Sequence, residues 1–484
     1  MFADDSEPSS PNPSGPVTLP NSALSRRQLL QQTACGFGSL ALTGMLQSAR
    51  GSHALQPATP MHAAKAKRVI FIFMQGGPSH VDTFEHKPDL YRFHDKKAEF
   101  NNPRTRKVQE EKVMKPLWDF RQHGQCGQHV SSLFPETARH VDKLCFLHGM
   151  HTEGVAHGPA TLFLHTGATN LVRPSVGAWI SYGLGSENEN LPAFGTINPT
   201  ANKGGPRNYS NAFLPAIHQG TILGSPGDRN AAPQFRNLQG PADTADQDRQ
   251  RQYDFLQRLN RSQAGSGINS DLEGAIDSME LAWRMQSRAG GIVDLDRETE
   301  ATRALYGIDQ EKTEAFGRQC LAARQLAESG VRYIQISHCD NGATPVWDQH
   351  SNMPKHQDLA LEVDRPIAGL LADLEQRGLL EDTLVWWGGE FGRTPFTQGK
   401  DGRDHNPRGF TTWLAGGGVK PGFSYGSTDD LGFAAVEGKV HMHDLHATIL
   451  HLLGMDHEQL TYRYAGRDFR LTDVFGHVVK EILA

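Results

Sequence analysis

Short, continuously apolar stretches that end in glycine turns recur along the sequence. Residues 69–74 (VIFIFM) are apolar throughout and run into Gly76, Gly77 and Pro78, and residues 383–387 (TLVWW) run into another pair of glycines. Two similar stretches lie in GVRYIQISHCDNG and FTTWLAGGG. Apolar runs of this length, bounded by turn residues, are typical of strands that are buried on both faces of a parallel sheet.

Amphipathic helical segments lie between these strands. One is ALEVDRPIAGLLADLEQRG, in which Gly378 is suited to end the helix. Its apolar positions are Leu361, Ile367, Leu370, Leu371 and Leu374. Alternating strands and helices predict an α/β domain, folded as a three-layer α/β/α sandwich with a mainly parallel central sheet. Ligands of such sheets bind beyond the carboxyl ends of the strands.

The segment from about residue 200 to residue 330 differs from the rest of the chain. It contains a polar stretch rich in helix-breaking residues, PGDRNAAPQFRNLQGPADTADQDRQRQ, followed by helices predicted near residues 251–259 and 297–329. We interpret this segment as a loop-rich helical insertion. It would belong to one domain that spans residues 67–484.

Residues 1–54 carry the pattern of an export signal. A Ser-, Pro- and Asn-rich start is followed by SRRQLLQ, which contains Arg26 and Arg27, then by a modest apolar stretch and by small residues before Leu55. This pattern predicts a twin-arginine signal peptide, recognised by the twin-arginine export machinery, and a location in the periplasm or cell envelope. No other stretch approaches the length of a spanning helix, so no transmembrane helix is expected in the mature chain.

Charge and cysteine content exclude some classes of protein. The chain has 48 Lys and Arg against 54 Asp and Glu, a formal net charge of -6, so no nucleic-acid partner is expected. The 5 cysteines are scattered and form no C-x-x-C pair, which gives no sign of a zinc ribbon.

Imidazole and carboxylate side chains gather where the predicted strands end. Where such groups meet at one sheet edge they can hold a divalent ion, and zinc, manganese, calcium and iron are all candidates. The four groups are Gln75, His80 and Asp82; His151 and His157; Asp348 and His350; and Glu390 and Arg393 with Asp404 and His405.

The order of these motifs resembles that of the alkaline-phosphatase/sulfatase superfamily. Within it, the chain more closely resembles a family of exported bacterial proteins that is described as a domain of unknown function. The motifs that carry the resemblance are GGPSHVDTFEHKP, GEFGRTP, GRDHNP and WLAGGGVKPG, and the resemblance covers roughly residues 67–200 and 330–484. The stretch VHMHDLHATILHLLGMD is similar to the closing helix of sulfatases, with Asp444, Thr448 and Gly454 at the matching positions. The resemblance implies an alkaline-phosphatase-like sandwich.

The resemblance raises a question about HGPATLFLHTG, residues 157–167. Type I sulfatases carry C-x-P-S-R-A-A-L-L-T-G at this place, and their cysteine becomes the nucleophile. Here His157 takes the cysteine position and Thr161 the arginine position. A histidine that opens a helix could bind a metal, bind an anion, act as a nucleophile or only cap the helix. We take His157 as a candidate catalytic residue, together with Arg393, which either clamps an oxyanion or forms a surface ion pair.

The resemblance also implies metal ligands. One metal of the alkaline phosphatases takes an Asp and a His from a loop and a later His, and Asp348, His350 and His405 match these places. The second metal would fall on Gln75, His157, Glu390 and Phe391, and neither an amide nor a phenyl ring suits it. That second site is either lost or rebuilt. The predicted ligands are therefore Asp348, His350, His405 and Glu390, with His80, Asp82, His151 and Asp404 as further candidates.

The resulting hypothesis is an exported metal-dependent hydrolase of phosphate or sulfate esters. Its substrate would be an anionic ester, and a sulfated or phosphorylated polysaccharide is one candidate. The alternative is a non-catalytic envelope protein, for binding or scaffolding, that retains the fold; the altered nucleophile and second-metal positions favour it. A third hypothesis, phosphomutase-like transfer, fits export less well, because phosphorylated metabolites are mainly cytoplasmic.

Overall fold

The computed structural model describes residues 55–236, 238, 246–264, 270–288 and 291–484. The chain divides into two units, Met1–Ser52 and His53–Ala484, and the fold described below is that of the second unit. The predicted export signal at residues 1–54 lies outside the described residues.

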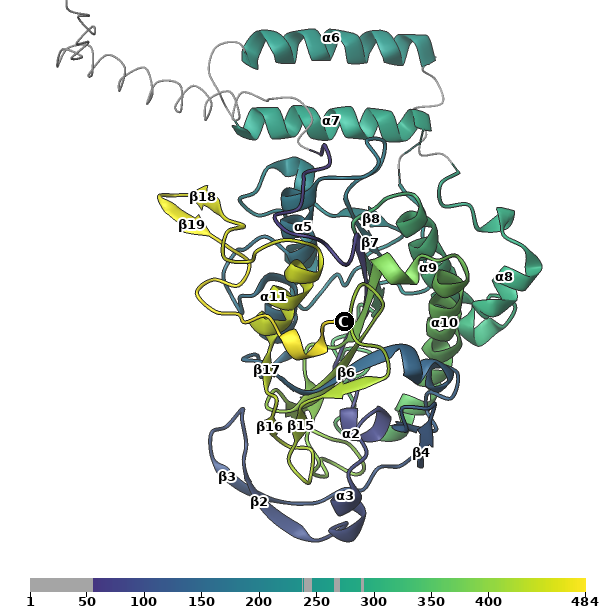
Figure 1. Ribbon diagram of the computed structural model, residues 1–484, viewed down its shortest axis with the longest axis vertical. Coiled ribbons are helices and arrows are strands. Elements are labelled where there is room, and N and C mark those ends of the chain that lie inside the picture. Colours follow the sequence, from purple (N-terminus) through teal and green to yellow (C-terminus); the bar gives the residue numbers. More distant parts are fainter. Residues whose placement is uncertain (1–54, 237, 239–245, 265–269, 289–290) are drawn as a thin grey trace, which may run out of the picture. The chain divides into compact units, whose positions relative to one another are not determined.

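A nine-stranded sheet forms the centre of this unit (Figure 1). Its strands are β1 (Arg68–Met74), β6 (Leu144–His151), β7 (Phe194–Ile197), β8 (Thr221–Leu223), β9 (Tyr333–His338), β10 (Thr383–Gly388), β13 (Phe410–Ala415), β14 (Phe423–Tyr425) and β17 (Val440–His441). They follow the order β14-β6-β13-β10-β1-β9-β7-β8, and β17 also pairs with β6. Only β13 runs antiparallel to its neighbours, so the prediction of a mainly parallel sheet is confirmed.

The central strand β1 is buried along its whole length. Because side chains alternate along a strand, its residues divide between two hydrophobic clusters. Ile70 and Ile72 belong to one cluster, and Phe71 and Phe73 to the other. Burial on both faces explains why this strand is apolar at every position.

Helices cover both faces of the sheet (Figure 1). α9 (Glu311–Glu328) and α10 (His356–Gln376) pack on the face of Ile70 and Ile72. α4 (His157–Thr166), α5 (Val176–Leu184) and α11 (Met442–Leu452) pack on the opposite face. This arrangement is the predicted three-layer sandwich.

α10 is the amphipathic helix that the sequence predicted. Gly378 follows its end with a φ of +67°, a conformation that glycine adopts without strain. Ile367, Leu370 and Leu371 are buried, whereas Leu361 is 50% exposed. The apolar face of α10 is therefore narrower than the sequence pattern indicated.

Residues 200–330 contribute to the sheet and to a pair of helices. β8 is the edge strand of the sheet, and α9 covers one sheet face. α6 (Asp246–Ala264) and α7 (Ser270–Arg288) lie side by side, and the rings of Tyr253 and Trp283 stack with their centroids 4.8 Å apart (Figure 1). Where one helix was expected over residues 297–329, α8 (Glu300–Leu305) and α9 are separated by a turn, and α7 was not predicted.

Short elements surround the sandwich. The helices are α2 (His80–Thr83) and α3 (Pro88–Arg92). The strand pairs are β2 (Lys97–Asn101) with β3 (Val108–Lys112), β4 (Phe120–His123) with β5 (Gln128–Ser131), β11 (Gly392–Arg393) with β12 (His405–Asn406), β15 (Ser427–Thr428) with β16 (Ala435–Glu437), and β18 (Tyr462–Tyr464) with β19 (Arg467–Phe469). Among the residues that the structure describes, no helix combines the length and the hydrophobicity that a bilayer span requires.

The register of the central strands brings three loops to one edge of the sheet. Met74 of β1 pairs with His338 of β9, and Phe73 pairs with Gly388 of β10. Since these strands are parallel, the loops that follow them begin side by side. This is the edge at which sheets of this type bind ligands.

Candidate metal centre

Four metal-binding side chains meet at this edge. Asp348 and His350 lie in the loop after β9, His405 lies on β12, and His157 is the first residue of α4. Each offers one nitrogen or oxygen atom, and these atoms all lie within 4.8 Å of one another. We call these four residues the His/Asp cluster; it could hold a metal ion.

The carboxylate of Asp348 lies at the centre of the His/Asp cluster. Nε2 of His157 is 3.1 Å from its Oδ2, and Nε2 of His350 and of His405 are 2.9 and 3.3 Å from its Oδ1. The Nε2 atoms of His350 and His405 are 3.1 Å apart. Two imidazole nitrogens at this distance cannot both carry a proton without repulsion, so at least one presents a lone pair to the cluster.

Each of the three histidines is held from behind through its other ring nitrogen. The contacts are His157 Nδ1 to Glu390 Oε1 at 2.6 Å, His405 Nδ1 to the Val155 carbonyl oxygen at 3.0 Å, and His350 Nδ1 to Gln398 Oε1. Because all three partners are acceptors, each Nδ1 donates a proton to its partner. In the neutral imidazole, Nε2 then faces the cluster with its lone pair, as in histidines that bind metals.

Glu390 stands behind His157. It is fully buried, and both its carboxylate oxygens lie 3.0 Å from the backbone nitrogen of Gly76, which donates to them. The sequence suggested Glu390 as a metal ligand. Its carboxylate is instead directed at Gly76 and at the ring of His157, outside the His/Asp cluster.

Arg393 is also fully buried, and its guanidinium contacts the central carboxylate. Nη2 lies 2.8 Å from Oδ1 of Asp348, Nε donates to the carbonyl oxygen of Gly77 at 3.0 Å, and Nη2 also donates to the carbonyl oxygen of Gly76. Arg393, which the sequence suggested as a clamp for an oxyanion, is thus bonded to Asp348 and to the backbone after β1. It places a fixed positive charge beside the cluster.

Phe391 packs against two of the histidines. Its ring centroid lies 5.0 Å from that of His157 and 4.5 Å from that of His405. A phenyl ring cannot ligate a metal. It restricts the rotation of both imidazoles and excludes water from this side.

The electrostatics of the cluster are set by burial and by contact between opposite charges. Burial alone would raise the pKa of the Asp348 carboxyl, but its contacts with His157, His350 and His405 hold that pKa far below its usual range. Burial lowers the pKa of His157, yet the carboxylates of Asp348 and Glu390 outweigh it and the pKa is raised. For His405 burial dominates and lowers the pKa to about 4. Asp348 is therefore ionised at any physiological pH.

The structure does not bring His80 or Asp82 to the cluster. Asp82 is completely buried and forms an ion pair with Arg403, whose Nε lies 2.7 Å from its Oδ2. Nε2 of His80 contacts the carbonyl oxygen of Gly432 at 2.8 Å. Because Arg403 comes two residues before His405, the buried pair with Asp82 anchors the segment that carries His405.

His151 and Gln75 also point elsewhere. His151 pairs with His441 in the sheet, and their ring centroids are 5.0 Å apart. The side-chain amide of Gln75 donates to Thr200 Oγ1 at 2.6 Å and to Asn202 Oδ1 at 3.1 Å. Gln75 fixes the loop after β7 and offers no group to the cluster.

Asp404 lies at the border of the cluster. Its Oδ1 is 3.7 Å from Nδ1 of His350, and its Oδ2 is 3.7 Å from Nη2 of Arg104. It adds negative charge next to the ligand atoms without reaching them.

Sequence reasoning missed Gln398 and the carbonyl group of Val155, which orient His350 and His405. No motif marks either position. Only the sequence position of Gln398 could have indicated its role, because it lies in the loop between Arg393 and His405, which were both candidate site residues.

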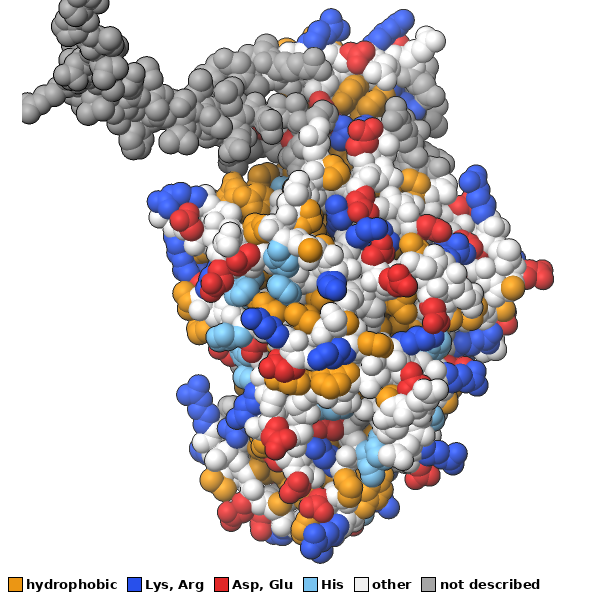
Figure 2. Space-filling model, in the orientation of Figure 1, with side chains coloured by type: hydrophobic (Ala, Val, Ile, Leu, Met, Phe, Trp, Pro, Cys, Tyr) orange, Lys and Arg blue, Asp and Glu red, His pale blue; other side chains and the backbone are white. Residues whose placement is uncertain are grey.

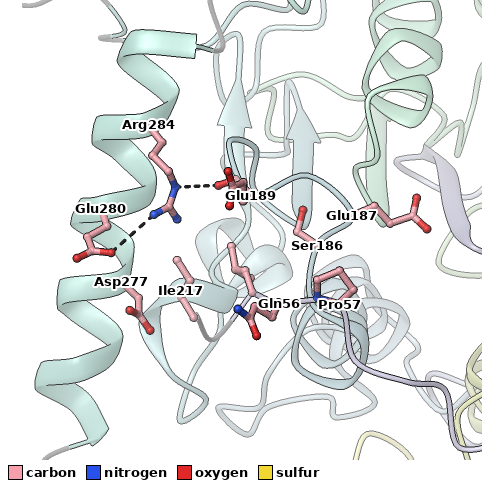
Figure 3. A pocket seen from close by; sticks show the side chains of 10 residues that line it. Gln56, Pro57, Ser186, Glu187, Glu189, Ile217, Asp277, Glu280 and Arg284 are labelled. Atoms are coloured by element: carbon pink, nitrogen blue, oxygen red, sulfur yellow. Dashed lines mark hydrogen bonds and ion pairs between the residues drawn. The ribbon is translucent and has the colours of Figure 1, made fainter. Parts of the chain in front are cut away.

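A separate cavity of about 510 Å³ lies beside α7 (Figure 3). Arg284 reaches from α7 toward Glu189, donating from Nε to its carbonyl oxygen at 2.9 Å, and pairs with Glu280 at 3.7 Å. None of the residues that line this cavity belongs to the His/Asp cluster. The convergent donor atoms lie instead at the carboxyl edge of the sheet.

The second unit is thus an α/β/α sandwich that carries a His/Asp cluster beyond the ends of its parallel strands. The chain belongs to the family described as "Protein of unknown function (DUF1501)", whose sequence model matches residues 66–483. No curated protein matches the sequence.

The chain is also similar, at a low level, to several solved structures. The PsFucS1 sulfatase from Pseudoalteromonas sp. is 14% identical, with a TM-score of 0.36, over 81% of this chain and 68% of that one. The phosphonate monoester hydrolase SpPMH from Silicibacter pomeroyi is 12% identical, with a TM-score of 0.33, over 67% and 69%. The alkaline phosphatase from the Antarctic bacterium TAB5 is 10% identical, with a TM-score of 0.33, over 82% and 99%. Similarity at this level carries no information on substrate or reaction.

Proposed function

We propose that this protein is a metal-dependent hydrolase of phosphate or sulfate esters, and that the His/Asp cluster binds one divalent cation. The common orientation of the three imidazoles carries the proposal, because each Nδ1 is tied to an acceptor and each Nε2 faces Asp348. Nε2 of His157 is buried, and the described residues offer it no hydrogen-bond partner of normal geometry, although it lies 3.1 Å from the carboxylate. A cation would satisfy this nitrogen and the other three donors together.

The donor set narrows the choice of metal. Three imidazole nitrogens and one carboxylate oxygen suit zinc, manganese or iron. Calcium, which the sequence left open, prefers six to eight oxygen ligands and fits this set poorly. We therefore expect a transition metal or zinc.

The residues around the cluster would prepare it for an anionic ester. A bound divalent ion lowers the pKa of water and polarises an ester oxygen. Glu390 fixes the ring of His157, and Arg393 fixes Asp348 and adds positive charge. The start of α4 at His157 directs backbone N–H groups toward the same place, which favours an anion. The side chain of His350 is 33% exposed, so solvent reaches the cluster from its side.

His157 is assigned to the metal and not to nucleophilic attack. Its Nδ1 donates to Glu390, and its Nε2 lies among the ligand atoms of the cluster, where a bound metal would occupy its lone pair. Water is then the attacking group. The lack of a nucleophilic role for His157 also favours a second candidate function, a metal-containing protein that binds anions without turning them over.

Metal content and turnover together test both candidates. The protein is purified without chelator, metal is measured by plasma mass spectrometry, and aryl phosphate, sulfate and phosphonate esters are screened with and without added metal. We expect about one ion per chain and ester hydrolysis that a chelator abolishes. Bound metal with no turnover on any ester would select the binding protein, and a folded protein that takes up no metal would refute the metal centre.

We also propose that the protein acts in the periplasm or cell envelope. The support is the SRRQLLQ stretch and the apolar residues after it. Replacing Arg26 and Arg27 with lysine should leave the protein in the cytoplasmic fraction. Unchanged export of this variant would contradict a twin-arginine route.

A further inference from the structure

The hairpin of β2 and β3 carries three cations at its tip. The tip reads NPRTRK and contains Arg104, Arg106 and Lys107, all exposed. Figure 2 shows Lys and Arg side chains gathered in this region, at the left edge of the molecule. Of these three cations, only Arg104 has a carboxylate partner among the described residues, Asp404 at 3.7 Å. The tip is therefore a concentration of positive charge on a chain whose net charge is -6.

The tip lies beside the His/Asp cluster. The carboxylate of Asp404 that contacts Arg104 lies 3.7 Å from His350 through its other oxygen. Asp404 also directly precedes His405. One carboxylate thus separates the first cation of the tip from two of the proposed ligands.

The hairpin is fixed in this position. The ring of Phe100 on β2 stacks on Phe396, with centroids 4.2 Å apart, and meets Phe433 edge-on. The carbonyl oxygen of Lys112 on β3 accepts a hydrogen bond from the backbone of Thr397 at 2.8 Å. Since Thr397 precedes Gln398, which orients His350, the hairpin is tied to the frame of the cluster.

The backbone of the tip is ordered as well. Oδ1 of Asn102 accepts hydrogen bonds from the backbone nitrogens of Arg104 at 2.8 Å and Thr105 at 3.1 Å. The backbone that carries the three cations is thus ordered before an anion binds, which reduces the entropy lost on binding.

A second hairpin shows what ordinary surface arginines look like in this protein. In the hairpin of β18 and β19, Arg463 lies 3.2 Å from Asp468, and Arg467 pairs with Asp473. Each arginine there is neutralised by a nearby aspartate. The tip of the β2–β3 hairpin lacks such partners for Arg106 and Lys107 in the described part of the chain.

We propose that the tip of the β2–β3 hairpin binds a second anionic group of the substrate, so that the protein binds polyanions more tightly than isolated monoesters. This inference rests on the proposed function of the His/Asp cluster. Guanidinium and ammonium groups are the natural partners of sulfate and phosphate oxygens. On a chain with net negative charge, a polyanion also needs such a local basic element to approach the site.

Polyanion binding tests the proposal without turnover. Dextran sulfate and inorganic polyphosphate are titrated by calorimetry against the full-length protein, with neutral dextran as the blank. The variant Arg104→Gln, Arg106→Gln, Lys107→Gln is compared with the matched control Arg463→Gln, Arg467→Gln. We expect binding to weaken at least about tenfold in the first variant, with a smaller salt dependence, and to change less than about twofold in the control. The polyanion that binds more tightly indicates a sulfated or a phosphorylated substrate.

Equal binding by the tip variant and the unaltered protein would overturn the proposal, and so would an equal loss in both variants. Both variants carry exposed substitutions, and thermal unfolding confirms that each is folded. Titration of Asp348→Asn separates this proposal from the proposed function. If that variant and the unaltered protein both lack metal while the tip still binds polyanions, the hydrolase is refuted and the anion-binding hairpin stands.

Discussion

Two sets of histidines in this protein have different surroundings: His157, His350 and His405 of the His/Asp cluster, and the buried His165, His443 and His446. His157 begins α4, and His165 lies two turns further along the same helix, near His443 and His446 of α11. Nε2 of His165 has no hydrogen-bond partner in the described part of the chain, and burial lowers its pKa to about 3. Burial likewise lowers the pKa of His443 to about 3 and that of His446 to about 4.

The comparison teaches that burial does not make a histidine a ligand. His157 and His165 are 8% and 2% exposed. The difference lies in the acceptors around them: carboxylates flank both nitrogens of His157, whereas the rings of Phe71 and Phe73 pack against His165. Carboxylates favour a cation between the rings, and phenyl groups favour a neutral imidazole.

Replacing the central carboxylate should abolish metal binding. Asp348→Asn keeps the shape of the side chain but removes the charge on which three imidazoles converge. We expect metal affinity to fall by more than about 100-fold, measured by competition with a chromogenic chelator. The matched variant His165→Gln, in the second set of histidines, should keep full occupancy. Loss of metal from both variants would contradict the proposed difference between the two sets of histidines.

Replacing the carboxylate behind His157 should weaken the metal without removing a ligand. Glu390→Gln leaves an acceptor for Nδ1 but lowers the basicity of the ring, and we expect about 10- to 100-fold lower affinity. Glu85→Gln is the control, because Glu85 is another buried glutamate, whose contacts with His148, His80 and Lys87 outweigh burial and lower its pKa to about 2. An affinity unchanged by Glu390→Gln would show that the contact with His157 has no effect on the metal.

Acid should destabilise the fold through the second set of histidines. Their folded pKa values lie below 6.5, so between pH 6.5 and 4 the unfolded chain binds more protons, and stability falls as the pH falls. Each such histidine contributes about 1.4 kcal/mol per pH unit, roughly tenfold in the unfolding equilibrium. Urea unfolding at pH 6.5 and 5.0 should show a smaller loss for His165→Leu than for the unaltered protein. Equal losses would mean that His165 is not kept neutral by burial.

Removing the outer partner of His350 should have the smallest effect. Gln398 is half-buried, and water can replace its oxygen as the acceptor for Nδ1. We expect Gln398→Ala to lower metal affinity about threefold in the chelator competition. A loss of metal affinity as large as that in Glu390→Gln would show that the solvent exposure of the hydrogen-bond partner has no influence on affinity.

The sheet could be predicted because its central strands are buried on both faces. The apolar run at residues 69–74 became β1, Arg68–Met74, and that at residues 383–387 became β10, Thr383–Gly388. α7 was missed. Leu281 and Met285 are buried one helical turn apart, but Met279 of the same helix is 57% exposed, so the apolar positions do not mark a single buried face.

The site could be predicted only in part. Asp348 and His350 lie in the segment after β9, and His405 lies in the segment after β10, so the common edge of these parallel strands brought the three together. His80 and Asp82 also follow a strand end, but Asp82 pairs with Arg403, 321 residues away in the sequence. No local pattern records such a contact. Nor does a pattern tell a ligand from the residue behind it, which is why Glu390 was expected among the ligands and His157 was taken first as a catalytic residue, with metal binding as one of its alternatives.

X-ray absorption at the metal edge, on protein reconstituted with zinc, tests the ligand set most directly. The account predicts a four-coordinate ion with three imidazole nitrogens at about 2.0–2.1 Å and one carboxylate oxygen. The imidazole scattering should weaken by one third in His157→Ala. A spectrum with two imidazoles, unchanged in His157→Ala, would contradict the assignment of His157 to the metal.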